Sequence, residues 1–157
     1  MSPENTEKLY ANFPQLYRSR TKTIQESTMP FGFQCEDGWF DVIWNLSVAI
    51  EEIAAKAGLD PNSDDWPDTA YVKQERGAFF FKLENNTLPE IDTLIDEAST
   101  LGSSTCEECG AYGYPIMNES HWIKTLCYEH AETYVDKNRK KQSTLYNLYE
   151  TFAKFRF

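Results

Sequence analysis

The segment "TCEECG", Thr105–Gly110, places two cysteines two residues apart and follows the second with a glycine. Such a pair is typical of half a metal site or half a redox motif. A thioredoxin-like redox pair opens a helix after a strand, whereas this pair follows "LGSST" and precedes the turn-forming "GAYGYP". The segment therefore predicts a metal-binding turn, and its other ligands must lie elsewhere in the chain.

A second pair lies in "LCYEH", Leu126–His130, and completes the pattern Cys-x2-Cys-x17-Cys-x2-His. Two close pairs of soft ligands separated by a loop of this size are typical of structural zinc, which takes four ligands tetrahedrally. The predicted ligands are Cys106, Cys109, Cys127 and His130. Four protein ligands leave no position for an activated water, so we expect the zinc ion to stabilise the fold and not to catalyse.

The segments around the two pairs predict a treble-clef-like element. Gly110 allows the turn that brings the first two sulfurs together, "HWIKT" indicates a strand, and "CYEHAETYVDK" indicates a helix with its ligands in the first turn. His121 is interpreted as a surface histidine, with a role as ligand or as hydrogen-bond partner of a ligand left open. Acidic residues surround the site and disfavour a nucleic-acid role: Glu107, Glu108, Glu119, Glu129 and Glu132.

Length and charge limit the remaining options. The chain has 157 residues, 41% of them hydrophobic, and a formal net charge of −10, which predicts a single domain and disfavours nucleic acid as a partner. No apolar run is long enough for a bilayer and no secretory signal is evident, so we expect a cytoplasmic protein without a membrane partner. In that reducing compartment the cysteines should stay thiols, and Cys35 is interpreted as a packed one.

The pattern of apolar residues divides this domain into four parts. Residues 1–30 are predicted to form an N-terminal helix, broken by Pro14, and a loop. Residues 31–102 form an α+β core, residues 103–136 the zinc-binding element, and residues 137–157 a basic C-terminal helix with an aromatic stripe. The fold class predicted is therefore α+β, with a small antiparallel sheet packed against amphipathic helices.

Within the core, "DGWFDVIWNLSVAIEEIAAKAG", Asp37–Gly58, is the strongest helical segment. Asp37 is predicted to cap it and Gly58 to end it. The inward positions predicted are Trp39, Ile43, Leu46, Ile50, Ile53 and Ala57. A second helix is predicted over Leu88–Gly102, with Gly102 as its stop.

"TAYVKQERGAFFFKLE", Thr69–Glu84, predicts a hairpin that turns at Glu75–Gly77. Aromatic and basic side chains of this hairpin and of the first core helix are candidates for contacts with a ligand or a partner. The candidate residues are Asp37, Trp39, Lys73, Arg76 and Phe80.

Four blocks of the chain resemble, in the same order, a family of small proteins of tailed phages and prophages whose function is uncharacterised. The blocks are "FGFQCEDGWFDVIWNL", "VKQERGAFFF", "IDEAS" and "CEECG…WIKTLCYEH", within Tyr10–Ala131. The matching motif positions are Asp37, Gly38, Trp39, Lys73, Gly77 and the four predicted zinc ligands. The chain departs from the family at Ala78 and Phe80, where a glycine-rich turn and a basic residue are usual. The resemblance implies a phage accessory protein in the bacterial cytoplasm and brings no established activity.

Three functions remain open after this reading, and an enzyme is disfavoured because no acid/base pair is defined by spacing. The first is a non-enzymatic protein that binds a host protein, to inhibit a host defence or to redirect a host enzyme. The second is a protein that sequesters a small ligand or nucleotide through stacking and phosphate contacts of Trp39, Lys73, Arg76 and the aromatic residues of the hairpin. The third is a nucleic-acid-binding zinc protein.

Overall fold

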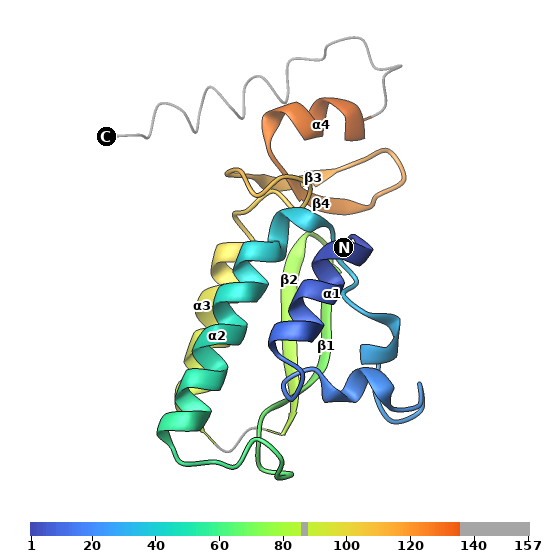
Figure 1. Ribbon diagram of the computed structural model, residues 1–157. Coiled ribbons are helices and arrows are strands. Elements are labelled where there is room, and N and C mark those ends of the chain that lie inside the picture. Colours follow the sequence, from blue (N-terminus) through green and yellow to red (C-terminus); the bar gives the residue numbers. More distant parts are fainter. Residues whose placement is uncertain (86–87, 136–157) are drawn as a thin grey trace, which may run out of the picture.

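The computed structural model describes residues 1–85 and 88–135 (Figure 1). Four α-helices run over Pro3–Asn12 (α1), Phe40–Lys56 (α2), Pro89–Gly102 (α3) and Tyr128–Tyr134 (α4). The strands are Asp68–Glu75 (β1), Ala78–Asn85 (β2), Tyr114–Met117 (β3) and Ile123–Leu126 (β4), and they pair as two antiparallel hairpins. Short 3-10 turns cover Arg18–Thr21 (η1), Met29–Phe31 (η2) and Asp37–Trp39 (η3). The predicted α+β class is confirmed, and the predicted C-terminal helix over 137–157 lies outside the described residues.

Helix α2 confirms the predicted long helix but not its predicted cap. Trp39 is the residue that precedes the helix, and no side chain caps it. The Asp37 carboxylate instead accepts a hydrogen bond from the backbone N–H of Ser2 at 2.7 Å, so the assignment of Asp37 as the helix cap is wrong. Gly58, with φ of 77°, ends the helix as predicted.

The inward face of α2 follows the helical period, since Ile43, Leu46 and Ile50 are buried. At the C-terminal end Ala54 is buried, while Ala57 is exposed. The prediction for Ala57 is wrong because α2 ends at Lys56, so Ala57 follows the last helical turn instead of lying on its inward face.

The β1–β2 hairpin is joined by Arg76 and Gly77, whose φ angles are 53° and 79°. Two positive φ angles define the type I′ turn that matches the twist of a hairpin. Alternate side chains of the two strands point to the core, among them Val72, Phe79 and Phe81. The free edge of β1 is covered by Gln34, which exchanges backbone hydrogen bonds of 2.9 Å with Val72 and Gln74.

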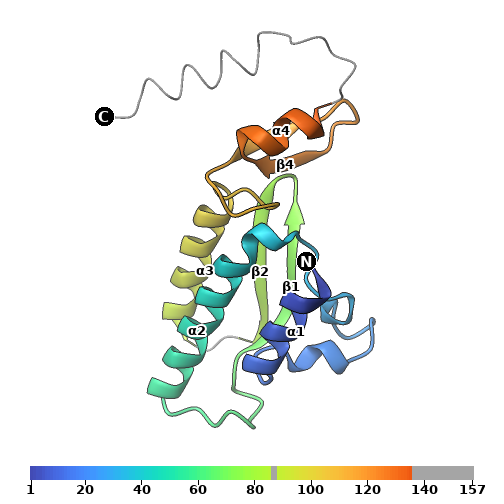
Figure 2. The same cartoon turned by 45° about the horizontal axis from the view of Figure 1, so that its top comes forward.

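Helix α3 packs beside α2 and against β2 (Figures 1 and 2). It ends at Gly102 as predicted, but the glycine does not adopt a left-handed conformation. A Cβ atom at Gly102 would lie 2.5 Å from the Cβ of Phe79. The glycine is therefore required by close helix–strand packing and not by chain reversal.

The described residues form two hydrophobic clusters of very different size. The large one lies between α1, α2, α3 and the β1–β2 hairpin, and Trp39 and Tyr17 are among its fully buried members. The small one contains only Cys106, Ile116, Leu126 and Ala131 as buried residues. It belongs to the upper part in Figure 1, where β3, β4 and α4 lie. We call residues 103–135 the knuckle element and the larger part the core. Of the helices that the structure describes, none is both long and apolar enough to cross a membrane.

Candidate metal centre

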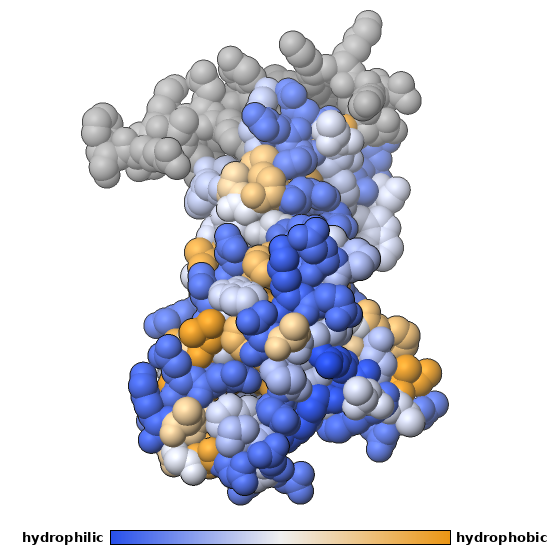
Figure 3. Space-filling model, viewed as in Figure 1, coloured by the Kyte–Doolittle hydropathy of each residue, from blue (hydrophilic) through white to orange (hydrophobic). Residues whose placement is uncertain are grey.

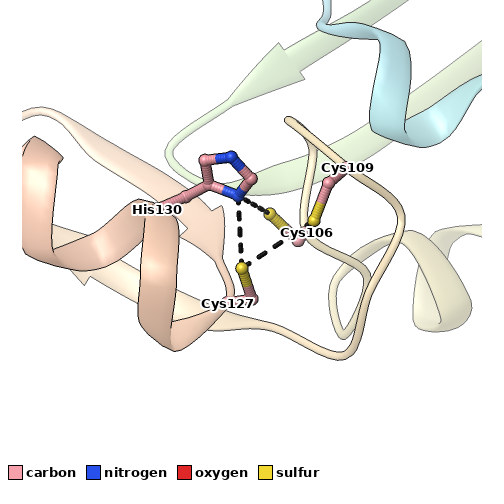
Figure 4. Close-up of side chains that lie close together, drawn as sticks. All are labelled: Cys106, Cys109, Cys127 and His130. Carbon is pink, nitrogen blue, oxygen red and sulfur yellow. Dashed lines mark hydrogen bonds between the residues drawn. The ribbon is translucent and has the colours of Figure 1, made fainter.

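The four predicted ligands lie together at one point of the knuckle element (Figure 4). Cys106 and Cys109 come from the turn between α3 and β3, which closes through a Gly110 N–H to Cys106 C=O hydrogen bond of 2.8 Å. Gly110 has φ of 79°, a conformation that glycine adopts without strain. Cys127 directly precedes α4, and His130 lies in its first turn. The order of turn, hairpin and helix agrees with the treble-clef-like element predicted.

Two of the three short distances within the cluster equal the edges of a tetrahedron around a metal ion, and the third is about 0.4 Å shorter than its edge. The Cys109 and Cys127 sulfurs are 3.8 Å apart, and His130 Nδ1 lies 3.2 Å from Cys127 Sγ and 3.6 Å from Cys106 Sγ. A tetrahedral ion with metal–sulfur bonds of about 2.3 Å and metal–nitrogen bonds of about 2.0–2.1 Å requires edges of about 3.8 Å and about 3.6 Å. All four ligand atoms lie within 4.8 Å of one another. The cluster can therefore hold one metal ion.

The cysteines are free thiols, not disulfides. Burial pushes the pKa of the Cys106 thiol upward, but the backbone N–H groups of Cys127, Cys109 and Glu108 outweigh it and hold the pKa below its ordinary value. Hydrogen bonds from backbone amides favour the thiolate, which is the form that binds a metal. These amides thus favour the thiolate of Cys106, whereas desolvation raises the pKa of the Cys109 thiol to about 11.

The turn that carries Cys106 and Cys109 is hydrogen bonded to the start of α2. The Gly38 N–H donates to the Glu107 carbonyl at 2.7 Å, and the Trp39 indole N–H donates to the Thr105 carbonyl at 2.7 Å. The backbones approach so closely that a Cβ atom at Gly38 would lie 2.2 Å from the Cys106 carbonyl oxygen. The segments "EDGW" and "TCEECG" therefore pack directly against each other.

The hairpins of the core and of the knuckle element also meet. The Thr125 hydroxyl donates to the Gly77 carbonyl at 2.6 Å, and the Gln74 side-chain amide donates to the Ile123 carbonyl. A Cβ atom at Gly77 would lie 2.9 Å from Cγ2 of Ile123. Two separate contacts thus hold the candidate metal centre against the core.

The five residues predicted to contact a ligand or partner do not form one site. Trp39 is fully buried, with its ring at 5.3 Å and 88° to that of Phe79, so it is inaccessible and its prediction as a contact residue is corrected. The Asp37 carboxylate accepts the hydrogen bond from the Ser2 N–H described above. Both residues stabilise the junction between the core and the segments packed on it.

Lys73 and Phe80 do lie together, because they are opposite one another in the β1–β2 register. The Lys73 ammonium is 6.0 Å from the centre of the Phe80 ring and 2.9 Å from a Glu75 carboxylate oxygen. Its hydrogen bond to Glu75 raises the pKa of Lys73. Arg76 is exposed in the adjoining turn. These three residues form an open surface of the hairpin.

Two remaining residues have the environments that the sequence indicates. Cys35 is buried, and burial raises the pKa of its thiol to about 12, which agrees with a packed and unreactive side chain. His121 is exposed at the tip of the β3–β4 hairpin with φ of 63°. It lies outside the ligand cluster, as expected for a surface histidine.

Sequence reasoning missed the importance of Gly38 and Glu107. Gly38 was assigned no contact of its own, although a glycine between Asp37 and Trp39 at the start of a long helix is a signal for close backbone approach. Glu107 was counted as one of the acids around the site, yet only 1% of its side chain is exposed. A charged residue between two metal ligands gives no sequence signal of burial.

No family model, curated protein or solved structure matches this chain.

Proposed function

We propose that the protein is a non-enzymatic, zinc-stabilised phage accessory protein that binds a host protein through its knuckle element. The ion proposed is a single structural zinc held by Cys106, Cys109, Cys127 and His130. Three sulfurs and one nitrogen that lie within 4.8 Å of one another are the donor set that zinc prefers, and four ligands leave no open position for catalysis. This observation carries the zinc assignment.

The exposed apolar side chains of the knuckle element support the binding of a protein partner. Trp122 at the tip of the β3–β4 hairpin is 71% exposed, and Tyr112, Met117 and Tyr128 are exposed as well. Large aromatic side chains are the residues on which protein interfaces most often depend. The burial of Trp39 removes one of the aromatic residues expected to stack on a nucleotide, while Phe80 of the hairpin stays exposed. The phage and host setting rests on the resemblance described above.

Zinc content tests the metal assignment. We expect about one zinc ion per purified chain by elemental analysis, and a Cys109→Ser variant that keeps less than the wild type because a ligand thiolate is lost. The matched control is Cys35→Ser, which removes a thiol 7% exposed in the core and should leave the zinc content unchanged. Zinc-free protein whose melting temperature does not respond to a chelator would contradict the assignment.

Capture from a host lysate tests the binding role. We expect wild-type protein to enrich a defined host protein, and Trp122→Ala to lose it, because an exposed anchor contributes about 2 kcal/mol or more to an interface. Phe31→Ala is the control, since Phe31 is 63% exposed but lies in η2, outside the knuckle element. Equal enrichment by the wild type and by Trp122→Ala would contradict binding through this hairpin tip.

A further inference from the structure

Two of the candidate metal ligands are accessible to solvent and lie close to one another. Cys109 is exposed and Cys127 is partly exposed, whereas Cys106 is fully buried. The Cys109 and Cys127 sulfurs are 3.8 Å apart and come from different segments, the turn after α3 and the start of α4 (Figure 4). A disulfide has an S–S distance of about 2 Å, so a small movement joins these two sulfurs.

The surroundings of this pair favour a small neutral oxidant. A cysteine that coordinates a metal is a thiolate, which is the nucleophilic form of the side chain. Glu108 and Glu129 are exposed within two residues of Cys109 and Cys127, and hydrophilic side chains make up much of the visible face of the knuckle element (Figure 3). Negative charge at this surface disfavours anionic oxidants. Hydrogen peroxide carries no charge and is smaller than alkylating reagents such as iodoacetamide, so it can reach the Cys109 sulfur.

We propose that the candidate metal centre is regulated by oxidation, in which hydrogen peroxide joins Cys109 and Cys127 in a reversible disulfide. The proposal rests on the zinc assignment made above and names the regulation of that site. Cys109 is the sulfur that reacts with peroxide, because it is the most exposed of the three ligand thiols. Cys127 is the second sulfur of the disulfide, and the buried Cys106 stays reduced.

The reaction consumes one molecule of hydrogen peroxide for each disulfide. The Cys109 thiolate attacks one peroxide oxygen, the O–O bond breaks, and the hydroxide that leaves takes up a proton from solvent. The Cys127 thiolate then attacks the sulfur of the resulting sulfenic acid, the S–S bond forms, and a second hydroxide leaves and is protonated. The two sulfurs together lose two electrons, and the peroxide is reduced to two molecules of water.

Oxidation should release the metal and loosen the knuckle element. The disulfide removes two thiolates from the ligand set and leaves Cys106 and His130, which are too few for a structural zinc ion. Trp122 and the other exposed side chains proposed to bind a partner lie on this element. We therefore expect peroxide to abolish the partner surface, and a dithiol reductant with zinc to restore it.

Peroxide treatment of the zinc-loaded full-length protein tests the proposal. We expect about one zinc ion to be released for each disulfide formed, followed with a chromogenic chelator, and to be taken up again after reduction with dithiothreitol. Mass spectrometry without reduction locates the disulfide after cleavage at Glu107 and Glu108, which separates Cys106 from Cys109. A disulfide that includes Cys106, release of zinc without a disulfide, or retention of zinc in a large excess of peroxide would overturn the proposal.

A substitution that keeps a metal-binding side chain tests the role of Cys127. Cys127→His retains four ligands but lacks the second sulfur, so the Cys109 sulfenic acid should be oxidised further to sulfinic acid, which dithiothreitol does not reduce. We expect this variant to lose zinc uptake permanently after peroxide treatment, whereas the wild type recovers it. Cys35→Ser is the matched control and should recover as the wild type does, since Cys35 is buried in the core. Full recovery of Cys127→His would overturn the assignment of Cys127.

Zinc content before oxidation keeps this proposal apart from the zinc assignment. A chain purified without zinc would contradict the zinc assignment. A chain that contains zinc but whose Cys109 and Cys127 are not joined by peroxide would contradict only the regulation. If Cys127→His does not bind zinc, the position of the disulfide in the wild type decides in its place.

Discussion

At the scale of single residues, Gly38 connects the candidate metal centre to the core. Its added Cβ would meet the Cys106 carbonyl oxygen at 2.2 Å and the Cys109 and Gly110 nitrogens at 2.6 Å. All three neighbours are backbone atoms of the turn that carries Cys106 and Cys109, and they cannot rotate away. We expect Gly38→Ala to lower the free energy of unfolding by about 1–3 kcal/mol or more and to weaken zinc binding about tenfold, measured by denaturation and chelator competition.

The control for this substitution is Gly58→Ala. Gly58 has positive φ but nothing within 4 Å of an added Cβ. It should cost about 1 kcal/mol of stability through backbone strain and leave zinc affinity unchanged. Equal zinc affinity in Gly38→Ala and the wild type would show that metal binding by the turn with Cys106 and Cys109 does not depend on its contact with Gly38.

Cysteine reactivity separates the roles of the four thiols. Because the thiolate is the reactive form and burial raises the pKa of Cys35 to about 12, Cys35 stays almost entirely protonated at pH 8. With iodoacetamide at pH 8 we expect no alkylated cysteine in the metal-loaded protein, three after chelation and four in denaturant, counted by mass spectrometry. Alkylation of Cys35 before the other three would contradict both its burial and the ligand assignment.

At the scale of elements, features that depend on residues close in sequence could be predicted, and contacts between distant segments could not. The period of α2, the turn of the β1–β2 hairpin and the ligand spacing all depend on residues close in sequence, and all three predictions agree with the structure. Trp39 and Thr105, which are hydrogen bonded, are 66 residues apart. No local pattern in the sequence indicates such a pairing, so the prediction that Trp39 contacts a ligand or partner is wrong.

The β1–β2 turn is an element whose sequence is not optimal for its geometry. A type I′ turn needs positive φ at both positions, which Gly77 adopts readily and Arg76 does not. We expect Arg76→Asn to raise the free energy of unfolding by about 0.5–1 kcal/mol, measured as a shift of the urea midpoint at constant slope. Arg76→Ala removes the same guanidinium without the preference for positive φ and should give no gain. A gain of the same size in Arg76→Ala would assign the effect to charge instead of backbone conformation.

At the scale of the whole molecule, the parts that contain the two hydrophobic clusters differ in how much their stability should depend on the metal ion. The core contains the large cluster, with buried residues from α1, α2 and the first hairpin. The hydrophobic side chains that the knuckle element buries are only Cys106, Ile116, Leu126 and Ala131. A cluster of that size is too small to stabilise an element alone, and small elements of this kind depend on a metal for their folding.

Metal removal should therefore act on one part of the molecule first. With excess chelator we expect the backbone amides of β3, β4 and α4 to lose protection from hydrogen exchange, while those of α2 and of β1 stay protected, because the core keeps its own cluster. The amide of Gly38 should follow the knuckle element, since its acceptor is the Glu107 carbonyl. Hydrogen exchange followed by mass spectrometry resolves these segments, and the Cys35→Ser variant with zinc bound provides the reference. Protection of β3 and β4 that persists without metal would show that side-chain packing, and not the ion, stabilises the knuckle element.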